Sequence, residues 1–135
     1  MDRGYIRGFF DGEGSVGLFH CGKKRPEAVR PRLELSNTCL IILKEIYDFL
    51  VDEGYHPSIT SYAHIVGRKT IHYRLSLKRW REIIKFADEI GTNHPDKQAR
   101  FAAIRAHYSL VKLRNSRGDA VAAVQQMLKH SQKML

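Results

Sequence analysis

Residues 4–16 of the chain read GYIRGFFDGEGSV, with glycine at every fourth position over the first part of the segment. In an α-helix this spacing places Gly4, Gly8 and Gly12 in one stripe. Each glycine costs about 1 kcal/mol relative to alanine inside a helix, so a contact must compensate for the stripe. Small residues at this spacing allow two helices to approach at backbone distance, and no other predicted helix has a matching stripe. The segment therefore predicts a homodimer in which this helix packs against the same helix of a second copy.

Glu13 lies at the expected C-terminal end of this helix, where unpaired carbonyl groups make the local field negative. A carboxylate becomes favourable there when it binds a cation. Together with a neighbouring backbone carbonyl it offers the hard oxygen ligands that Mg²⁺ takes alongside phosphate and water. The alternative is an exposed glutamate in a turn. Asp11 cannot share the helix face of Glu13, because the two residues are only two positions apart, and it is interpreted as a supporting carboxylate.

Strand and helix patterns follow one another along the rest of the chain. Alternating apolar residues predict four strands, near residues 16–21, 33–36, 59–65 and 71–77. Helical spacing of apolar residues predicts four further helices, at about residues 39–53, 79–90, 96–114 and 119–133. Thr38 is expected to cap the first of these helices at its N-terminus, and Gly54 to end it. Residues 22–31, rich in charge and proline, are predicted to form a long basic loop.

The predicted order of elements is αββαββα, followed by a helical tail. This order predicts an α+β fold in which one antiparallel sheet has its helices gathered on one face. With 135 residues, the chain is expected to form a single domain with a core at about residues 4–104 and extra C-terminal helices at about 105–135.

The opposite face of the sheet is expected to carry polar side chains. These are Arg30, Arg32, Glu34, Ser36, Thr60, Tyr62, His64, Thr70, His72, Arg74 and Ser76. Strands can lie in a major groove, where arginine, serine and threonine can read base edges, so this face is a candidate DNA-binding surface. A solvated antiparallel face is the alternative, and Phe19 belongs either to this face or to the core. Basic residues of the two connecting loops are further DNA-binding candidates: Lys23, Lys24, Arg25, Arg68 and Lys69.

The charge of the chain favours a polyanionic partner. Lys and Arg together number 23 against 14 Asp and Glu, a formal net charge of +9, and nucleic acid is the first candidate. The longest apolar run, residues 39–43, is too short to span a membrane, so no membrane partner is expected. The N-terminus lacks the apolar stretch of a secretory signal, which predicts an intracellular protein. Two cysteines without CxxC spacing argue against a disulfide framework or a cysteine-ligated zinc site.

Residues 6–16 resemble the signature of the LAGLIDADG homing endonucleases. Residues 33–38 and 94–97 are also similar to this family, so the resemblance covers about residues 4–104. It implies the LAGLIDADG fold with an antiparallel saddle-shaped sheet. It also implies an intron-encoded endonuclease that acts as a homodimer and cuts both strands of a long, nearly palindromic DNA site, using Mg²⁺ or Mn²⁺. The alternative is a relative that does not cut and serves as an intron-RNA splicing cofactor or a DNA-binding regulator.

The resemblance also implies roles for individual residues of this chain. Glu13 matches the metal-binding acid of the family, and Gly14 the position whose backbone carbonyl also faces the metal. Asn37 matches a polar position of the active site, although a turn residue before Thr38 is the alternative for it. Lys97 is the nearest match to the catalytic lysine of the family.

Overall fold

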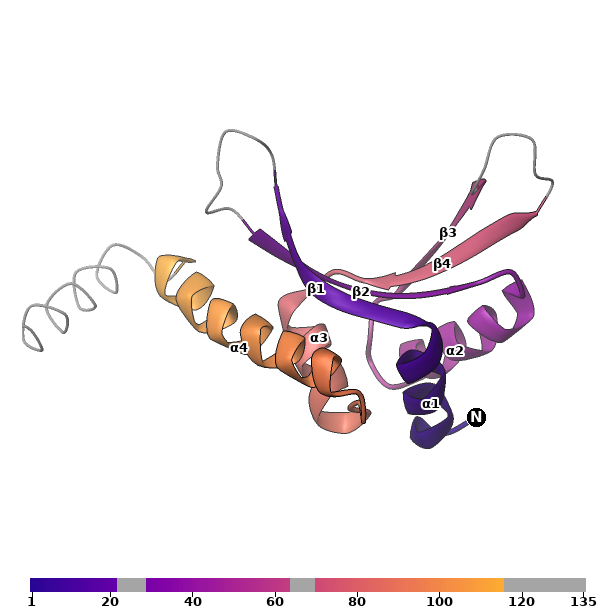
Figure 1. The fold of residues 1–135 in the computed structure, drawn as a ribbon, viewed down its shortest axis with the longest axis horizontal. Coiled ribbons are helices and arrows are strands. Elements are labelled where there is room, and N and C mark those ends of the chain that lie inside the picture. Colours follow the sequence, from indigo (N-terminus) through magenta and orange to yellow (C-terminus); the bar gives the residue numbers. More distant parts are fainter. Residues whose placement is uncertain (22–28, 64–69, 116–135) are drawn as a thin grey trace, which may run out of the picture. The chain divides into compact units, whose positions relative to one another are not determined.

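The computed structural model describes residues 1–21, 29–63 and 70–115. The chain divides into two compact units, Met1–Ile104 and Arg105–Leu135. Its helices and strands are, in chain order, α1 (Arg3–Glu13), β1 (Gly14–His20), β2 (Val29–Asn37), α2 (Leu40–Asp52), β3 (Ser58–Ala63), β4 (Ile71–Leu77), α3 (Trp80–Glu89) and α4 (Pro95–Asn115) (Figure 1). In the second unit, the C-terminal part of α4 places the Lys112 ammonium group 4.9 Å from the centre of the Tyr108 ring. The tail helix predicted at 119–133 lies outside the described residues.

The four strands of the first unit form one antiparallel sheet in the order β1-β2-β4-β3. Val16 of β1 pairs with Leu33 of β2, and Leu33 pairs with Leu77 of β4, so these buried side chains share one face of the sheet. Figure 1 shows α1, α2 and α3 on one side of the sheet, and the strands bend away from them at both ends. The predicted α+β fold is therefore confirmed, and the face without helices is concave.

Two residues one helical turn apart hold α1 against the sheet. Ile6 and Phe10 are both fully buried. The Phe10 ring meets the Phe86 ring of α3 edge-on at a centroid distance of 5.2 Å, and the Phe101 ring of α4 lies 5.8 Å away. Burying one phenylalanine side chain stabilises a fold by about 1.5–3 kcal/mol. This aromatic cluster therefore fixes the C-terminal part of α1, where the helix passes directly into β1.

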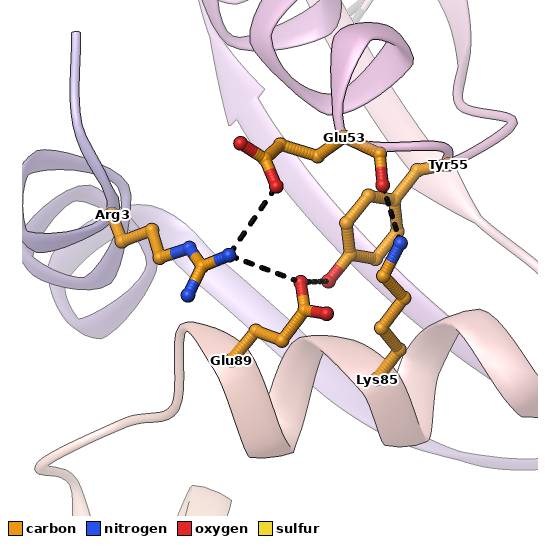
Figure 2. A network of polar contacts seen from close by, with 5 residues as sticks. All are labelled: Arg3, Glu53, Tyr55, Lys85 and Glu89. Atoms are coloured by element: carbon orange, nitrogen blue, oxygen red, sulfur yellow. Dashed lines mark hydrogen bonds and ion pairs between the residues drawn. The ribbon is translucent and has the colours of Figure 1, made fainter.

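A network of polar contacts fixes the N-terminal part of α1 (Figure 2). The guanidinium group of Arg3 lies 3.3 Å from the Glu53 carboxylate, just after α2, and 3.7 Å from the Glu89 carboxylate of α3. Glu89 also accepts a 3.3 Å hydrogen bond from the Tyr55 hydroxyl, and Lys85 donates to the backbone carbonyl of Glu53. Exposed ion pairs add little stability singly, so the main effect of the network is to orient α1 relative to α2 and α3.

The start of α2 differs from the prediction that Thr38 caps it. Cys39 occupies the N-cap position without a side-chain cap, and Thr38 is exposed. The side-chain oxygen of Asn37 accepts a 2.8 Å hydrogen bond from the backbone N–H of Cys39. Asparagine readily makes this contact two residues ahead, and the resulting turn leads the chain from β2 into α2. Gly54 ends α2 as predicted, with a positive φ of 92°.

Strand β2 begins earlier than predicted, because residues 29–31 belong to it and not to the basic loop. Pro31 pairs with Leu18 of β1, although proline has no N–H to donate. The pairing between β2 and β4 starts only at Leu33, so Pro31 lies where β2 has a strand on one side alone. Proline is tolerated at such an edge because its missing N–H breaks no ladder hydrogen bond there.

Candidate functional site

The junction between α1 and β1 places Glu13 at an exposed helix end. Glu13 is the last residue of α1, and Gly14 caps the helix by donating its backbone N–H to the carbonyl oxygen of Phe10. A β-carbon on Gly14 would overlap the Phe10 ring and lie 2.7 Å from the Phe10 carbonyl oxygen. Only glycine fits there, and the close approach to Phe10 sets the position of the preceding Glu13.

Lys97 of α4 reaches the same helix end. Its ammonium group donates hydrogen bonds to the backbone carbonyl oxygens of Phe10, at 2.7 Å, and of Asp11, at 2.8 Å. Burial lowers the pKa of Lys97, and the Asp11 carboxylate opposes that shift. These carbonyls belong to the negative end of the helix dipole, where a cation is stabilising. The structure therefore brings Lys97 and Glu13, 84 positions apart in the sequence, to the end of one helix.

Asp11 has the supporting role predicted for it. Its carboxylate accepts a hydrogen bond from the Thr92 hydroxyl and another, of 3.1 Å, from the backbone N–H of Asn93. The Thr92 hydroxyl in turn accepts from the backbone N–H of His94, at 3.1 Å. These contacts tie α1 to the turn between α3 and α4, the turn that leads the chain to Lys97.

Asn37 lies at the same end of the sheet as Glu13, because Gly14 pairs with Leu35, two residues before Asn37 on β2. Its side-chain oxygen accepts the hydrogen bond from the backbone N–H of Cys39. Asn37 therefore has the role of a turn residue, which was the alternative to a role in the active site in the sequence analysis. The side-chain nitrogen is the group of Asn37 that such a turn leaves for a ligand.

The glycine stripe of α1 faces outward from the described part of the chain. A β-carbon on Gly8 or Gly12 would meet no atom of the described residues within 4 Å, and one on Gly4 would lie 3.4 Å from the Asp2 carboxylate. Tyr5, three positions before Gly8 on α1, is 48% exposed. The stripe is therefore not used for packing inside the described chain.

The concave face carries nine of the eleven predicted polar residues, as the register of the sheet shows, whereas Thr70 precedes β4 and lies outside the strands. Glu34 pairs with Ser76, Ser36 pairs with Arg74, and Arg74 also pairs with Thr60 of β3. Directly paired residues project to the same side of a sheet. Ser76 is only 5% exposed, so its neighbours cover it. Six of the predicted DNA-binding residues lie outside the described residues: Lys23, Lys24, Arg25, His64, Arg68 and Lys69.

The centre of this face is a set of contacts among charged and aromatic side chains. Glu34 lies 3.3 Å from both Arg32 and Arg74. The guanidinium carbon of Arg32 lies 4.8 Å from the centre of the Phe19 ring, and that of Arg74 lies 4.5 Å from the centre of the Tyr62 ring. Phe19 is 43% exposed and therefore belongs to the concave face, which resolves its open assignment.

Sequence reasoning missed these aromatic supports. The available signal is the strand register: Phe19 pairs with Arg30 and Tyr62 with His72, so each ring lies diagonally across from its arginine. Diagonal neighbours are within reach of aromatic and long side chains. A pairing scheme for the strands would have been needed to use that signal.

The predicted divalent metal needs protein groups that can bind it. No group of three or more His, Cys, Asp or Glu side chains among residues 1–21, 29–63 and 70–115 could hold a metal ion. Mg²⁺, however, keeps several waters and is often bound through one or two carboxylates plus substrate phosphates. An exposed Glu13 beside the carbonyl of Gly14 suits that mode of binding, in which a substrate phosphate and water supply the remaining oxygens.

In the described part of the chain, no helix has the length and apolar character needed to cross a membrane.

The fold and the site define a class of α+β protein: a glycine-faced helix ends in an exposed carboxylate beside a concave, arginine-bearing sheet. The family model of the LAGLIDADG-like domain matches residues 1–91, and the chain belongs to this family. A search of curated proteins gave no match.

Solved structures of LAGLIDADG homing endonucleases share the fold. The LAGLIDADG homing endonuclease I-GzeII, in complex with its DNA target, is similar with a TM-score of 0.63 at 17% identity over 93% of this chain. I-LtrWI, bound to target DNA, gives a TM-score of 0.58 at 13% identity over 93% of this chain. This chain spans 42% of the length of each of these two. The homing endonuclease I-TnaI gives a TM-score of 0.56 at 13% identity, covering 78% of this chain and 70% of that one.

Proposed function

We propose that the chain is a site-specific DNA endonuclease that acts as a homodimer and cuts both strands of a long, nearly palindromic site with a divalent metal. The observation that carries the proposal is the end of α1, where the Glu13 carboxylate is exposed and Lys97 is held by the last carbonyls of the helix. Similar structures with bound DNA, those of I-GzeII and I-LtrWI, support DNA as the substrate.

The outward-facing glycine stripe supports the homodimer. Gly8 and Gly12 have open space in front of them within the described chain, so a second α1 can approach at backbone distance. Packing two copies along this stripe brings two helix ends together, each carrying Glu13. Two such ends match a duplex, because each strand presents one phosphodiester to be cut.

Glu13 and the backbone carbonyl of Gly14 would hold the divalent cation, together with phosphate oxygens of the DNA. When bound, the metal supplies Lewis-acid stabilisation of the reacting phosphate and activates water. Lys97 keeps the end of α1 in place and compensates the negative end of its dipole. The side-chain nitrogen of Asn37 can hydrogen-bond water or phosphate at the same end of the sheet.

The concave face would bind the duplex next to this end. Arg30, Arg32 and Arg74 provide cations for phosphates and base edges, and a phosphate contact releases a counterion. The predicted loop residues Lys23, Lys24, Arg25, Arg68 and Lys69 would extend this surface along the DNA backbone.

The proposal is tested by incubating the purified chain with a duplex that spans its own coding locus without any intron, in Mg²⁺ and in EDTA. We expect a specific double-strand cut in the presence of Mg²⁺ and no cut in EDTA. Glu13→Gln should bind the same duplex and reduce cleavage more than a hundredfold, because the metal loses its charged protein ligand. Glu45→Gln, which removes an equal charge from an exposed site on α2, is the matched control. Specific binding without cutting by the unaltered chain would favour the regulator or splicing-cofactor alternative.

A further inference from the structure

Glu34 lies at the centre of the concave face, between two arginines. One carboxylate oxygen is 3.3 Å from Nη1 of Arg32, which donates a hydrogen bond to it, and the other is 3.3 Å from Nε of Arg74. The Glu34 side chain is 16% exposed, whereas those of Arg32 and Arg74 are 41% and 36% exposed. The Glu34 side chain is therefore largely covered, whereas both arginines are more accessible.

Each arginine is held on a second side by an aromatic ring. Arg32 stacks on Phe19 of β1 at 4.8 Å, and Arg74 stacks on Tyr62 of β3 at 4.5 Å. Stacking on a ring face is attractive for a guanidinium group and restricts its tilt. All four strands thus contribute to one arrangement in which two guanidinium planes are fixed before any ligand binds.

The atoms used in these contacts determine which edge of each guanidinium group is left for a ligand. Arg32 faces Glu34 with Nη1, which leaves its Nε and Nη2 edge, and Arg74 faces Glu34 with Nε, which leaves its two Nη groups. Either edge can form two parallel hydrogen bonds with the O6 and N7 atoms of guanine. One oxygen of Glu34 accepts from Arg32 and the other is ion-paired with Arg74, so the carboxylate is poorly placed to accept from a cytosine amino group.

We propose that Glu34 is a positioning residue that orients Arg32 and Arg74 for bidentate contacts with two guanines, and that Glu34 itself contacts no base. This inference rests on the proposed function, in which the concave face binds DNA. Both arginines meet one carboxylate, so the two guanines lie close together, within about three base pairs at about 3.4 Å of rise each. The benefit is specificity, because an arginine that is already oriented loses less side-chain freedom on binding.

Glu34 carries the wrong charge for a surface that binds a polyanion. Its negative charge weakens the attraction of every phosphate, whatever the base sequence. A positioning role accounts for the charge, since the same carboxylate that lowers general affinity sharpens the choice of base. Removing the charge should therefore move specific and non-specific binding in opposite directions.

The test is selection from a double-stranded DNA library with a randomised central window, followed by affinity measurements on the selected duplex and on a scrambled duplex. The unaltered chain should select two guanine positions per half-site. Arg32→Ala and Arg74→Ala should each lose the preference at one of them. Glu34→Gln should weaken both preferences about tenfold and raise affinity for the scrambled duplex. Glu45→Gln, the matched loss of charge on α2, should leave both preferences unchanged.

Glu34→Asp provides the second variant, because it keeps the charge and shortens the side chain so that it cannot meet both arginines. It should weaken the guanine preferences without changing affinity for the scrambled duplex. Unchanged guanine preferences in Glu34→Gln and Glu34→Asp, or a change confined to a third base pair, would overturn the positioning role while leaving DNA binding intact. If the unaltered chain selects no sequence at all, the proposed function itself is wrong, and this inference fails with it.

Discussion

The ammonium group of Lys97 lies 4.9 Å from the centre of the Phe10 ring and donates a 2.7 Å hydrogen bond to the backbone carbonyl oxygen of the same residue. Phe10 is fully buried and meets aromatic rings of α3 and α4. One residue of α1 therefore connects the hydrophobic core to a cation at the helix end that carries Glu13. The integrity of the proposed catalytic end depends on this connection.

Lys97→Met should destabilise the fold by about 1–3 kcal/mol, because it removes the two hydrogen bonds from the ammonium group, and of the two carbonyls only that of Phe10 still accepts from the Gly14 N–H. Urea denaturation followed by circular dichroism measures this change. Lys97→Arg, which keeps the charge, should recover part of the loss. An unfolding free energy that stays at the wild-type value in Lys97→Met would mean that the lysine has no structural role.

Tyr55 should make stability fall in alkaline solution. The phenol is 2% exposed, and burial, with the Glu89 carboxylate adding to it, raises its pKa above the usual value of about 10. The unfolded chain thus releases this proton at lower pH than the folded chain, so the unfolding free energy decreases as the pH rises above about 10. Tyr55→Phe should lose less stability than the wild type over that range in urea titrations. Parallel losses in the two proteins would argue against the shift.

Gly14→Ala should destabilise the fold by about 1–3 kcal/mol, because its β-carbon would overlap the Phe10 ring. Ser15→Ala is the matched control at the next residue of the chain, where the side chain is exposed. The control should leave the unfolding free energy within about 0.5 kcal/mol of the wild type, as exposed substitutions usually do. Thermal unfolding of the two variants in parallel makes the comparison, and equal effects would show that the junction tolerates a side chain.

Gly8→Leu should leave each chain folded but separate the two copies of the proposed dimer. The leucine projects into the space in front of α1 and prevents close approach of a second helix. Sedimentation velocity should find the wild type at twice the mass of one chain and the variant at the mass of one. Lys44→Leu, which adds the same side chain on an exposed position of α2, should not change the mass. A wild-type chain that sediments as a monomer with and without DNA would remove the homodimer from the proposal.

Periodicity in the sequence was sufficient to predict the elements of the described chain and the two faces of the sheet. Alternation along β2 separates Leu33 and Leu35 from Arg32 and Glu34, and the structure has the first pair buried and the second pair on the concave face. Such patterns are local, so a single sequence carries them.

The contacts that organise the site were not predicted, because they join distant parts of the chain. Lys97 bonds to a carbonyl 87 positions earlier, and no local pattern encodes that distance. The prediction that Thr38 caps α2 was wrong for a different reason. Asn37 and Thr38 are both residues that can form a turn, and it is Asn37 that accepts the hydrogen bond from the backbone N–H of Cys39. Pro31 appeared to belong to a loop because its place beside an open sheet edge depends on strand pairing.

The alternation of β2 has a consequence for how such a protein changes over generations. The odd-numbered residues Leu33 and Leu35 build the core, while the even-numbered residues between and beside them lie on the concave face. Under the proposed function, a codon change at an even-numbered position alters the DNA that is recognised without disturbing the core. Inherited variation can then move the enzyme to a new target while the scaffold and the catalytic end of α1 stay as they are.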